Sequence, residues 1–350
     1  MSGNTFGRIF RLTTYGESHG AGLGGILDGC PPNIPLDDSV LQKELDARKP
    51  GGNAASTPRR EMDKPLIFSG VFEGRTTGTP IAFHIVNTNQ NTGDYENLRD
   101  VYRPGHADYT FDAKFGFRDY RGGGRSSARE TVSRVAGGAV AQAFLATMGI
   151  RVHACSVSLG GIDAPLTDIA GAFSRPFFAP DESVIPLWEK RVKEARGAGD
   201  SLGGLVRIEA HGVPAGLGEP VFDKLDALFA HALMSVGAVK GVEVGAGFAV
   251  AASTGSRNND AITPQGFSSN NAGGILGGIS TGQPIVLTAA VKPIPSIAME
   301  QDTITKDGNA AKLSVGGRHD TAALPRIVPV LKAMTALVLA DAVLLQRRMG

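Results

Sequence analysis

The stretch that decides the fold is Arg121-Gly-Gly-Gly-Arg-Ser-Ser127, which runs directly into Ala128-Arg-Glu130 and a long alanine-rich segment. Ser127 and Glu130 form a capping box, in which the two side chains satisfy backbone N–H groups at the start of a helix. Apolar residues then recur at helical spacing until Gly149. The sequence therefore predicts a helix over about 127–149 that is entered through a loop of three glycines.

Strand-like and helix-like segments are mixed on both sides of this helix. Runs of branched and alternating apolar residues predict strands over 80–87, 204–210 and 247–253. Capping residues and apolar spacing predict further helices, one over about 37–47, one from Pro220 and one from about Pro325. No Pro- or Ser-rich linker divides the chain, so we expect an α+β fold in which helices are layered with antiparallel sheets.

A weak internal echo accompanies this pattern. Residues 29–47 and 212–227 both predict the end of a strand, then a Gly/Pro loop, then helical residues that include Leu-Asp-Ala. Short Gly-Pro matches arise easily by chance, so a duplicated unit and a coincidence are both open.

Composition excludes several classes of protein. The 350 residues contain 35 Lys and Arg against 34 Asp and Glu, a net charge of +1, which excludes intrinsic disorder and a broadly basic surface. Length alone suggests two domains at ~150 residues each. Cys30 and Cys155 have no metal-ligand spacing. No secretion signal is visible, and Pro329, Lys332 and Asp341 interrupt the most apolar stretch, so we expect a cytoplasmic protein without a membrane partner.

Cationic side chains concentrate around the glycine loop. They are Arg103, Arg118, Arg121, Arg125, Arg129 and Arg134, with Lys114 and His106. Glycines let the backbone approach a ligand, and the start of a helix offers N–H groups without intrahelical partners. This predicts an anion site for phosphate or carboxylate. A surface loop whose arginines pair with Asp119 and Glu130 is the alternative.

Three of the seven histidines lie in glycine-rich polar contexts typical of proton transfer: His19, His106 and His319. We interpret His84, inside a strand, and His231, inside a helix, as structural. No histidine spacing supports a zinc site, so no metal is expected. Segments 270–282 and 292–296 resemble binding loops, but neither fits a dinucleotide fingerprint or a P-loop.

At these residues the sequence resembles the chorismate synthase family. The resemblance covers residues 4–345 and rests on four segments in the family's order: Gly16–Gly20, Arg103–Thr110, Arg121–Thr131 and Gly317–Asp320. It implies one domain over residues 1–350, a β-α-β sandwich that assembles as a homotetramer, in place of the two domains suggested by length.

The resemblance also implies the reaction. 5-Enolpyruvylshikimate 3-phosphate would lose phosphate and a C6 hydrogen in a 1,4-anti elimination to chorismate, the last step of the shikimate pathway of aromatic amino acid biosynthesis. Such a carbon–oxygen lyase requires reduced FMN although the reaction is redox-neutral overall. FAD and NADP are also associated with this flavoprotein family. NADPH reduces the flavin in some members and others use an external reductant, and no motif here decides between them.

Roles follow by position in the matching segments. His19, supported by Ser18, would protonate the leaving phosphate, and His106 would protonate the reduced flavin or tune its charge. Asp320 would assist removal of the C6 proton through the flavin. The substrate would be bound by Arg48, Arg103 and Arg129. The FMN would be bound by Arg125, Ser126, Ser127, Gly237, Ala238, Gly277, Lys292, Pro293, Ile294, Pro295, Ser296 and Arg318.

The chain departs from the family pattern in three places. Thr321 stands where proline often follows the Gly317–Asp320 segment, and Ala54 stands where many members have arginine. The glycine loop begins Asn270-Asn271, where Asn-His is common. None of these changes removes a proposed catalytic group, but Ala54 removes a basic contact that Arg59 or Arg60 would have to replace.

Two alternatives come from other classes. The Arg121–Arg125 segment suggests an RNA-binding module of the arginine/glycine type. Such segments repeat in disordered basic tracts, whereas here one copy precedes a helix cap in a chain of net charge +1, so we expect no nucleic-acid partner. A phosphate-binding protein of this fold without catalysis is disfavoured, because the His and Asp candidates are all present.

Overall fold

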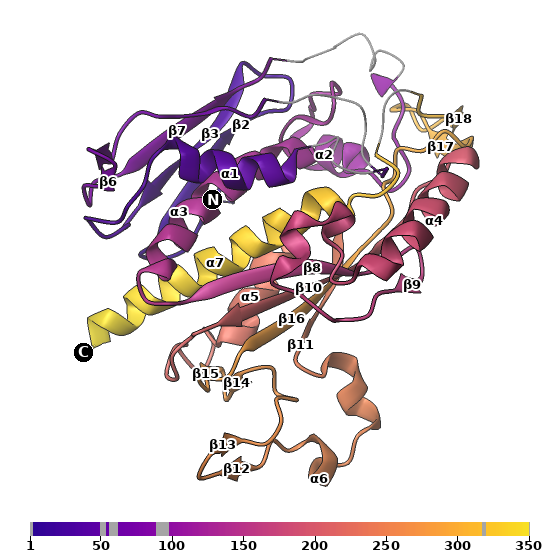
Figure 1. Cartoon of the computed structure of the whole chain (residues 1–350). Helices are drawn as coiled ribbons and strands as arrows, with labels where there is room; N and C mark the ends of the chain where they lie inside the picture. Colours follow the sequence, from indigo (N-terminus) through magenta and orange to yellow (C-terminus); the bar gives the residue numbers. More distant parts are fainter. Residues whose placement is uncertain (1–2, 50–53, 56–61, 89–97, 317–319, 350) are drawn as a thin grey trace.

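Two sheets enclose a layer of helices. The computed structural model describes residues 3–49, 54–55, 62–88, 98–316 and 320–349, and within these residues it contains two five-stranded antiparallel sheets (Figure 1). The first sheet has the order β1 (Thr5–Phe6), β2 (Arg11–Gly16), β3 (Gly22–Asp28), β7 (Ile81–Val86) and β4 (Pro65–Ile67). The second has the order β11 (Val239–Val244), β16 (Ile285–Val291), β10 (Gly204–His211), β8 (Arg151–Leu159) and β9 (Ile162–Asp163).

The helical layer contains α1 (Asp38–Arg48), α3 (Thr131–Ala146), α5 (Leu225–Met234) and α7 (Leu324–Met349). Peripheral elements are α2 (Asp108–Phe115), α4 (Ile185–Gly197), α6 (Gly255–Asn258) and the hairpins β5–β6 (71–76), β12–β13 (262–267), β14–β15 (275–280) and β17–β18 (301–313). Buried side chains from both sheets and all four central helices form one hydrophobic cluster. The predicted layering of helices with antiparallel sheets is therefore confirmed.

The internal echo corresponds to a duplicated topology. The chain runs β2-β3-α1-β4-β7-α3 and then β8-β10-α5-β11-β16-α7. Within the sheets, the order β2-β3-β7-β4 matches the order β8-β10-β16-β11, and every neighbouring pair is antiparallel. The two helices that end the units, α3 and α7, pack against each other, and a Cβ built on Gly138 would lie 2.3 Å from the Cβ of Ala333.

Helix α7 lies in the middle of the hydrophobic core. By length and composition alone it could span a membrane, but 94% of its most apolar window is buried inside the protein. Its Asp341 accepts hydrogen bonds from the backbone N–H groups of Arg8, Ile9 and Phe10, at 2.9, 2.7 and 2.9 Å. An acidic residue in this helix therefore fixes the N-terminal segment to the core.

Most of the predicted elements are confirmed and two are wrong. Strands 80–87 and 204–210 form β7 and β10, and α1 begins after its cap Asp37. Residues 247–252 form a 3-10 helix instead of a strand, and Phe248 there is 79% exposed, so its apolar run is not a buried sheet face. The helix predicted from Pro220 begins at Leu225, because the chain first turns back through the Glu219–Asp223 bridge.

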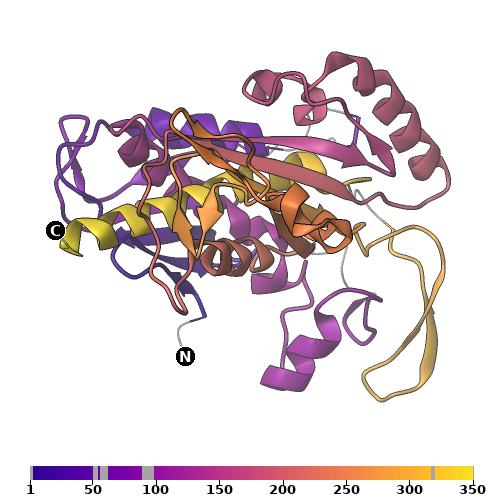
Figure 2. The ribbon, with the colours of Figure 1, turned by 90° about the horizontal axis from the view of Figure 1, so that it is seen from below.

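The loops that enter α3 and α7 meet the segment that follows β7. Residues 98–115, including α2, lie beside the β17–β18 hairpin on one side of the molecule (Figure 2). Val101 forms a β-bridge with Thr305, and the Tyr102 N–H donates to the Ile304 carbonyl at 3.2 Å. This pairing fixes the base of the loop that carries His106.

Candidate active site

The three glycines before α3 bring two of the predicted histidines together. Gly122, Gly123 and Gly124 have φ of +66°, +87° and +53°, a left-handed conformation that favours glycine. A Cβ on Gly122 would lie 2.4 Å from His19 Cε1, and a Cβ on Gly123 would lie 2.9 Å from His106 Cε1. The two imidazoles therefore pack against consecutive residues of one loop.

His19 lies in the connection between β2 and β3. Its Nδ1 is 3.1 Å from Ser18 Oγ, and this hydroxyl also lies 3.4 Å from the Arg121 carbonyl. The Asn87 amide, just after β7, donates to the carbonyls of Glu17, Ser18 and Gly20 at 3.0, 3.3 and 2.9 Å. The histidine loop is thus fixed from two sides.

His106 belongs to a buried cluster with Arg103 and Asp108. Its Nδ1 is 2.9 Å from Asp108 Oδ1 and 3.0 Å from an Arg103 terminal nitrogen. Arg103 also donates twice to the Asp108 carboxylate, at 2.7 and 2.8 Å. A carboxylate beside Nδ1 favours the tautomer with the proton on that nitrogen, so Nε2 is the atom left to exchange protons with a ligand.

Burial and charge set the proton affinities of this cluster. Burial lowers the pKa of His106, and Arg103 and Lys292 lower it further, while Asp108 opposes them. Burial alone would raise the pKa of Asp108, but hydrogen bonds from Arg103 and His106 hold it well below its usual range. Asp108 therefore stays ionised, and His106 is neutral at pH 7 until an anion approaches it.

Arg48 and Arg129 share a buried carboxylate at the start of α3. Arg48 is 1% exposed and donates to Thr131 Oγ1 at 3.0 Å, to the Ala128 carbonyl at 3.1 Å and to Asp63 at 3.2 Å. Arg129 pairs with the other oxygen of Asp63 and donates to Asn87 Oδ1 at 3.1 Å. The structure thus brings two predicted substrate residues together, with Arg48 enclosed and Arg129 nearer the surface.

A pair of lysines lies beside this cluster. The Lys292 amine donates to the Gly105 carbonyl at 2.6 Å, and the Lys292 N–H bonds the Ala238 carbonyl at 2.9 Å. Burial and the charge of Lys240 lower the pKa of Lys292. Among the described residues neither lysine forms an ion pair with a carboxylate, so Lys240 and Lys292 repel each other and favour an anion between them.

The other predicted cofactor residues divide into two groups. Pro295 contacts Gly105, Ser201 Oγ donates to the Ile294 carbonyl at 2.7 Å, and Ser296 is buried, so segment 292–296 lies at the site. Ser126 Oγ donates to the Gly123 carbonyl at 2.7 Å, and Ser127 caps the turn before α3. The Arg125 guanidinium instead bonds Gly16, Asn4 and Thr14, which fixes the loop to β2.

Two further predictions lie elsewhere. Gly277 is in the β14–β15 hairpin, at the end of β16 that is opposite to Lys292, so seven strand residues, about 20 Å, separate them. One copy of the chain does not bring Gly277 to the site. Arg318 and His319 are outside the described residues. Asp320, just before α7, is ion-paired with Arg326 at 3.2 Å.

Arg196 of α4 connects the two main departures from the family pattern. It donates to the Ala54 carbonyl and, at 3.2 Å, to the Thr321 hydroxyl. Arg59 and Arg60 are outside the described residues. Position 54 therefore contributes a backbone oxygen to Arg196, and the carbonyl of Ala55 accepts from the Thr321 N–H before α7.

Sequence reasoning missed Asn87, Asp63, Asp108 and Lys240 as site residues. Asp108 lies inside a quoted segment, two residues from His106, and that spacing was the available signal. Asn87 and Asp63 contact Arg129 from 42 and 66 positions away, and Asp63 contacts Arg48 from 15 positions away, so no local pattern indicates them. In the described parts of the chain, no cluster of three or more His, Cys, Asp or Glu is arranged for a metal ion.

Comparison with known proteins gives consistent matches. A family model described as chorismate synthase matches residues 10–344. A chorismate synthase of Nitratidesulfovibrio vulgaris (strain Hildenborough) is 68% identical over 350 residues, which cover 100% of this chain and 99% of that protein. One from Oleidesulfovibrio alaskensis is 66% identical over 350 residues, with coverage of 100% and 99%. A solved structure described as a crystal structure of chorismate synthase matches with a TM-score of 0.78 and 34% identity, over 97% of this chain and 93% of that chain.

Proposed function

This chain belongs to the chorismate synthase family, and from that premise we propose which of its residues carry out the family's reaction. The enzyme is a phosphate-lyase that converts 5-enolpyruvylshikimate 3-phosphate to chorismate in the shikimate pathway, and its family uses reduced FMN. The predicted fold, family and activity are confirmed. The roles of individual residues are proposals.

One observation carries the assignment of the site: His19 and His106 pack on adjacent glycines of the loop before α3, within a cluster of buried arginines. The substrate brings a phosphate and two carboxylates. Arg129 and Arg103 are proposed to bind these anions through charge-assisted hydrogen bonds. Arg48, enclosed by Thr131, Ala128 and Asp63, holds Arg129 in place through their shared carboxylate.

Lys240 and Lys292 fit a flavin phosphate, because two amines without a carboxylate partner among the described residues lie in the segments joined by the Lys292–Ala238 backbone hydrogen bond, where Ala238 has a left-handed φ of +73°. Gly237, Ala238 and segment 292–296 are proposed to hold FMN, with Ser126, Ser127 and Arg318. Arg125 acts by fixing their loop. When bound, reduced FMN supplies electron density to the departing C–O bond. Gly277 stays a prediction for the assembled enzyme, since it reaches the flavin only from a neighbouring copy.

Proton transfers are proposed for three residues of the chain. His106, with Nδ1 against Asp108, exchanges its proton through Nε2. Binding of a polyanion raises the pKa of His106 and so loads this donor when the ligand arrives. His19, oriented by Ser18, protonates the leaving phosphate. Asp320, oriented by Arg326, assists removal of the C6 proton.

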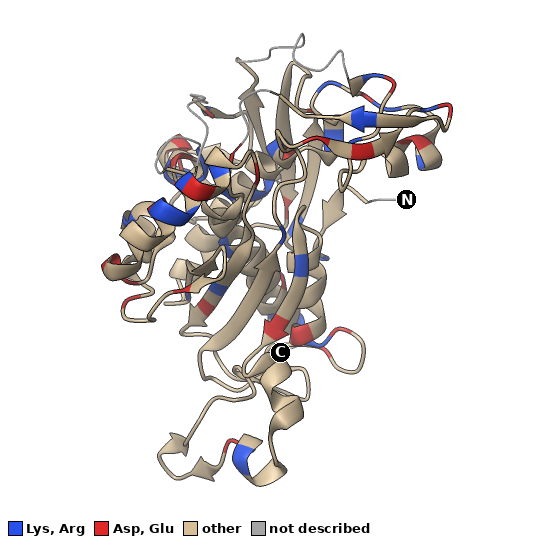
Figure 3. Cartoon of the chain, turned by 90° about the vertical axis from the view of Figure 1, so that its right-hand side faces the viewer, with Lys and Arg blue, Asp and Glu red and all other residues tan. Residues whose placement is uncertain are grey.

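Four further proposals concern the domain count, assembly, reductant and location of the enzyme. One domain over residues 1–350 is supported by the shared hydrophobic cluster. A homotetramer is supported by the outer face of the first sheet, where Tyr15, Ile26 and Phe68 are 43, 47 and 67% exposed. NADPH as the flavin reductant and a cytoplasmic location follow the family. Lys and Arg are interspersed with Asp and Glu over the described ribbon (Figure 3).

The test of the substrate site compares two arginine variants. Arg129→Ala should raise the substrate dissociation constant roughly 10- to 100-fold, since charge-assisted hydrogen bonds contribute about 1.5–3 kcal/mol. Arg121→Ala is the matched control, because that exposed side chain pairs with Asp119. Equal dissociation constants for the two variants would contradict the proposed binding of substrate by Arg129.

Anaerobic turnover with reduced FMN, and with oxidised FMN plus NADPH, tests which reductant the enzyme uses.

A further inference from the structure

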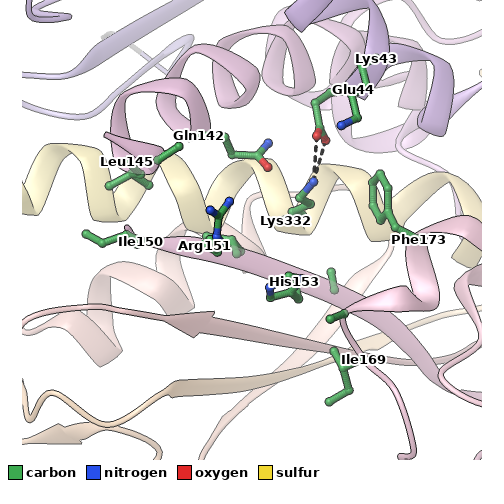
Figure 4. Close-up of a pocket in the computed structure, with 14 residues that line it drawn as sticks. Lys43, Glu44, Gln142, Leu145, Ile150, Arg151, His153, Ile169, Phe173 and Lys332 are labelled. Atoms are coloured by element: carbon green, nitrogen blue, oxygen red, sulfur yellow. Dashed lines mark hydrogen bonds and ion pairs between the residues drawn. The ribbon is translucent and has the colours of Figure 1, made fainter. Parts of the chain in front are cut away.

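A second cavity lies along the middle of the helical layer. Its volume is about 340 Å³, and it is bounded by α1, α3, α7 and the first half of β8 (Figure 4). The α3 residues that line it are Gln142, Leu145 and Ala146 in the last turns. The catalytic loops instead enter the first turn of α3, about 20 Å away along a helix that rises ~1.5 Å per residue. The cavity is therefore separate from the proposed active site.

The cavity carries more positive charge than the whole chain. Lys43, Arg151 and Lys332 line it together with one carboxylate, Glu44, and Lys43 and Arg151 are exposed; this is a local excess of two positive charges against a net charge of +1 for all 350 residues. The Lys332 amine lies 2.8 and 3.0 Å from the two Glu44 oxygens and 4.2 Å from the centre of the Phe173 ring. Glu44 is thus neutralised by Lys332, and the other two cations are in excess.

Two groups in the cavity point to a ligand. Gln142 lines the cavity, and its amide nitrogen is buried without a hydrogen-bond partner among the described residues (Figure 4). Arg151, an exposed residue at the start of β8, points toward the same space, and no ion pair with a carboxylate is found for it in the described part of the chain. A buried amide donor without a partner costs about 1–3 kcal/mol, and an acceptor on a ligand would recover this when the Gln142 amide turns its nitrogen toward the cavity.

The rest of the cavity wall is mainly apolar. Ile150, Ile169, Leu145 and Phe173 form it, together with the half-buried His153. Burial lowers the pKa of His153, and His211, Lys332 and Arg151 lower it further against the opposing charge of Glu209. His153 is therefore neutral at pH 7 and can donate a hydrogen bond without adding charge. An inorganic anion would leave the apolar wall without a partner.

We propose that this cavity binds a small organic acid, with a carboxylate held by Arg151 and Gln142 and a planar or branched apolar body against Ile150, Ile169 and Phe173. Ligand pockets of this kind start at about 300 Å³ and combine apolar walls with a few converging polar groups, as here. The proposal does not depend on the assignment of the catalytic residues.

The test uses 4-fluorobenzoate as the probe, followed by its fluorine NMR signal. The full chain is saturated with FMN and chorismate, so that the active site is filled. We expect saturable binding, at least tenfold weaker in Arg151→Gln, since a charge-assisted hydrogen bond contributes about 1.5–3 kcal/mol. The matched control is Arg191→Gln in α4, outside the cavity, which should bind the probe as the parent chain does. Turnover should be unchanged in both variants.

Two further measurements decide what the cavity recognises. Ala146→Trp, at the exposed rim, should abolish probe binding by filling the mouth while every charge is kept. Neutral 4-fluorobenzyl alcohol should bind at least tenfold more weakly than the acid. The proposal is overturned if no saturable binding occurs at millimolar probe, if both arginine variants bind alike, or if inorganic phosphate displaces the probe as well as benzoate does.

Discussion

The two duplicated units share a strand order and differ in the chemistry at equivalent loops. In the first unit, the β2–β3 connection carries His19, the end of α1 carries Arg48, and the segment before α3 carries the three glycines. In the second unit, the end of α5 leads to Ala238, the end of β16 leads to Lys292, and the segment before α7 carries Asp320.

This comparison separates scaffold from function. The equivalent ends of both units face one site, because α3 and α7 begin at the same end of the helical layer. In the proposed assignment, the first unit supplies histidines and substrate arginines, whereas the second supplies lysines for a cofactor phosphate and one carboxylate. The fold thus places loops, and the residues on those loops determine the reaction.

The largest effect should come from the histidines of the first unit. His19→Ala and His106→Ala should each slow turnover by roughly 10²–10⁴, the usual contribution of a general acid or base. His231→Ala, an exposed histidine of α5 beside Phe6, is the control and should retain full activity. The measurement is anaerobic turnover with reduced FMN. Parent-like rates in both variants would remove the first unit from the proton transfers.

A variant of Asp320 tests whether the second unit takes part in proton transfer. Asp320→Asn should lower kcat about 10²-fold with little change in KM, because the carboxylate is proposed to act on a proton and not to bind substrate. Asp302→Asn on the β17–β18 hairpin, where the side chain is 87% exposed, controls for the loss of an acidic residue nearby. A raised KM at parent kcat would instead place Asp320 among the binding residues.

Asp108 tests how the first unit sets the proton affinity of His106. Asp108 raises the pKa of His106 by its hydrogen bond and charge, so Asp108→Asn should lower that pKa further below its ordinary value. If His106 donates a proton, activity is lost as pH rises through its pKa, and the basic limb of kcat/KM should move to lower pH. We also expect a roughly 10- to 100-fold loss of kcat in Asp108→Asn. This loss is smaller than in enzymes where a carboxylate alone orients the histidine ring, because Arg103 also contacts the ring of His106.

The control for this pH shift is Asp112→Asn. Asp112 lies on the same helix, α2, and pairs with Arg118 at 3.1 Å. Its profile should keep the parent limbs. A basic limb that stays in place in Asp108→Asn would mean that His106 does not donate the proton that limits kcat/KM.

Much of this arrangement could be predicted from the sequence, and what could not has a physical reason. The capping residues, the glycine run and the histidine segments are local patterns, and the structure brings His19 and His106 together as expected. The capping box is only half formed: Ser127 accepts from the Arg129 N–H, but the Glu130 carboxylate pairs with Arg134, and α3 begins at Thr131. Asp63 and Asn87 were missed because their roles depend on side-chain contacts made only after folding. Arg125 and Gly277 carried family positions, but the structure turns one toward β2 and places the other at the far end of β16.

The smallest expected effect comes from a pair of glycine variants, which separates backbone strain from the packing of His106 against the glycine loop. Gly123→Ala and Gly116→Ala both place a side chain at left-handed φ, +87° and +70°, so each should lower the free energy of unfolding by about 1–2 kcal/mol. A Cβ on Gly116 meets nothing within 4 Å, whereas a Cβ on Gly123 meets Ser126 Oγ at 2.8 Å and His106 Cε1 at 2.9 Å. Only Gly123→Ala should therefore also displace His106, with a loss of kcat of about tenfold or less.

Chemical denaturation and anaerobic turnover of the two glycine variants make this comparison. Equal losses of stability with unequal losses of kcat would show that the first unit needs Gly123 for the contact with His106 and not only for the turn. Equal losses of kcat would mean that the left-handed turn alone matters, and the packing of the histidine on the glycine loop would then have no part in catalysis. Because α7 is entered without an equivalent run of three glycines, the same substitution pair cannot be built in the second unit, and the result belongs to the first unit alone.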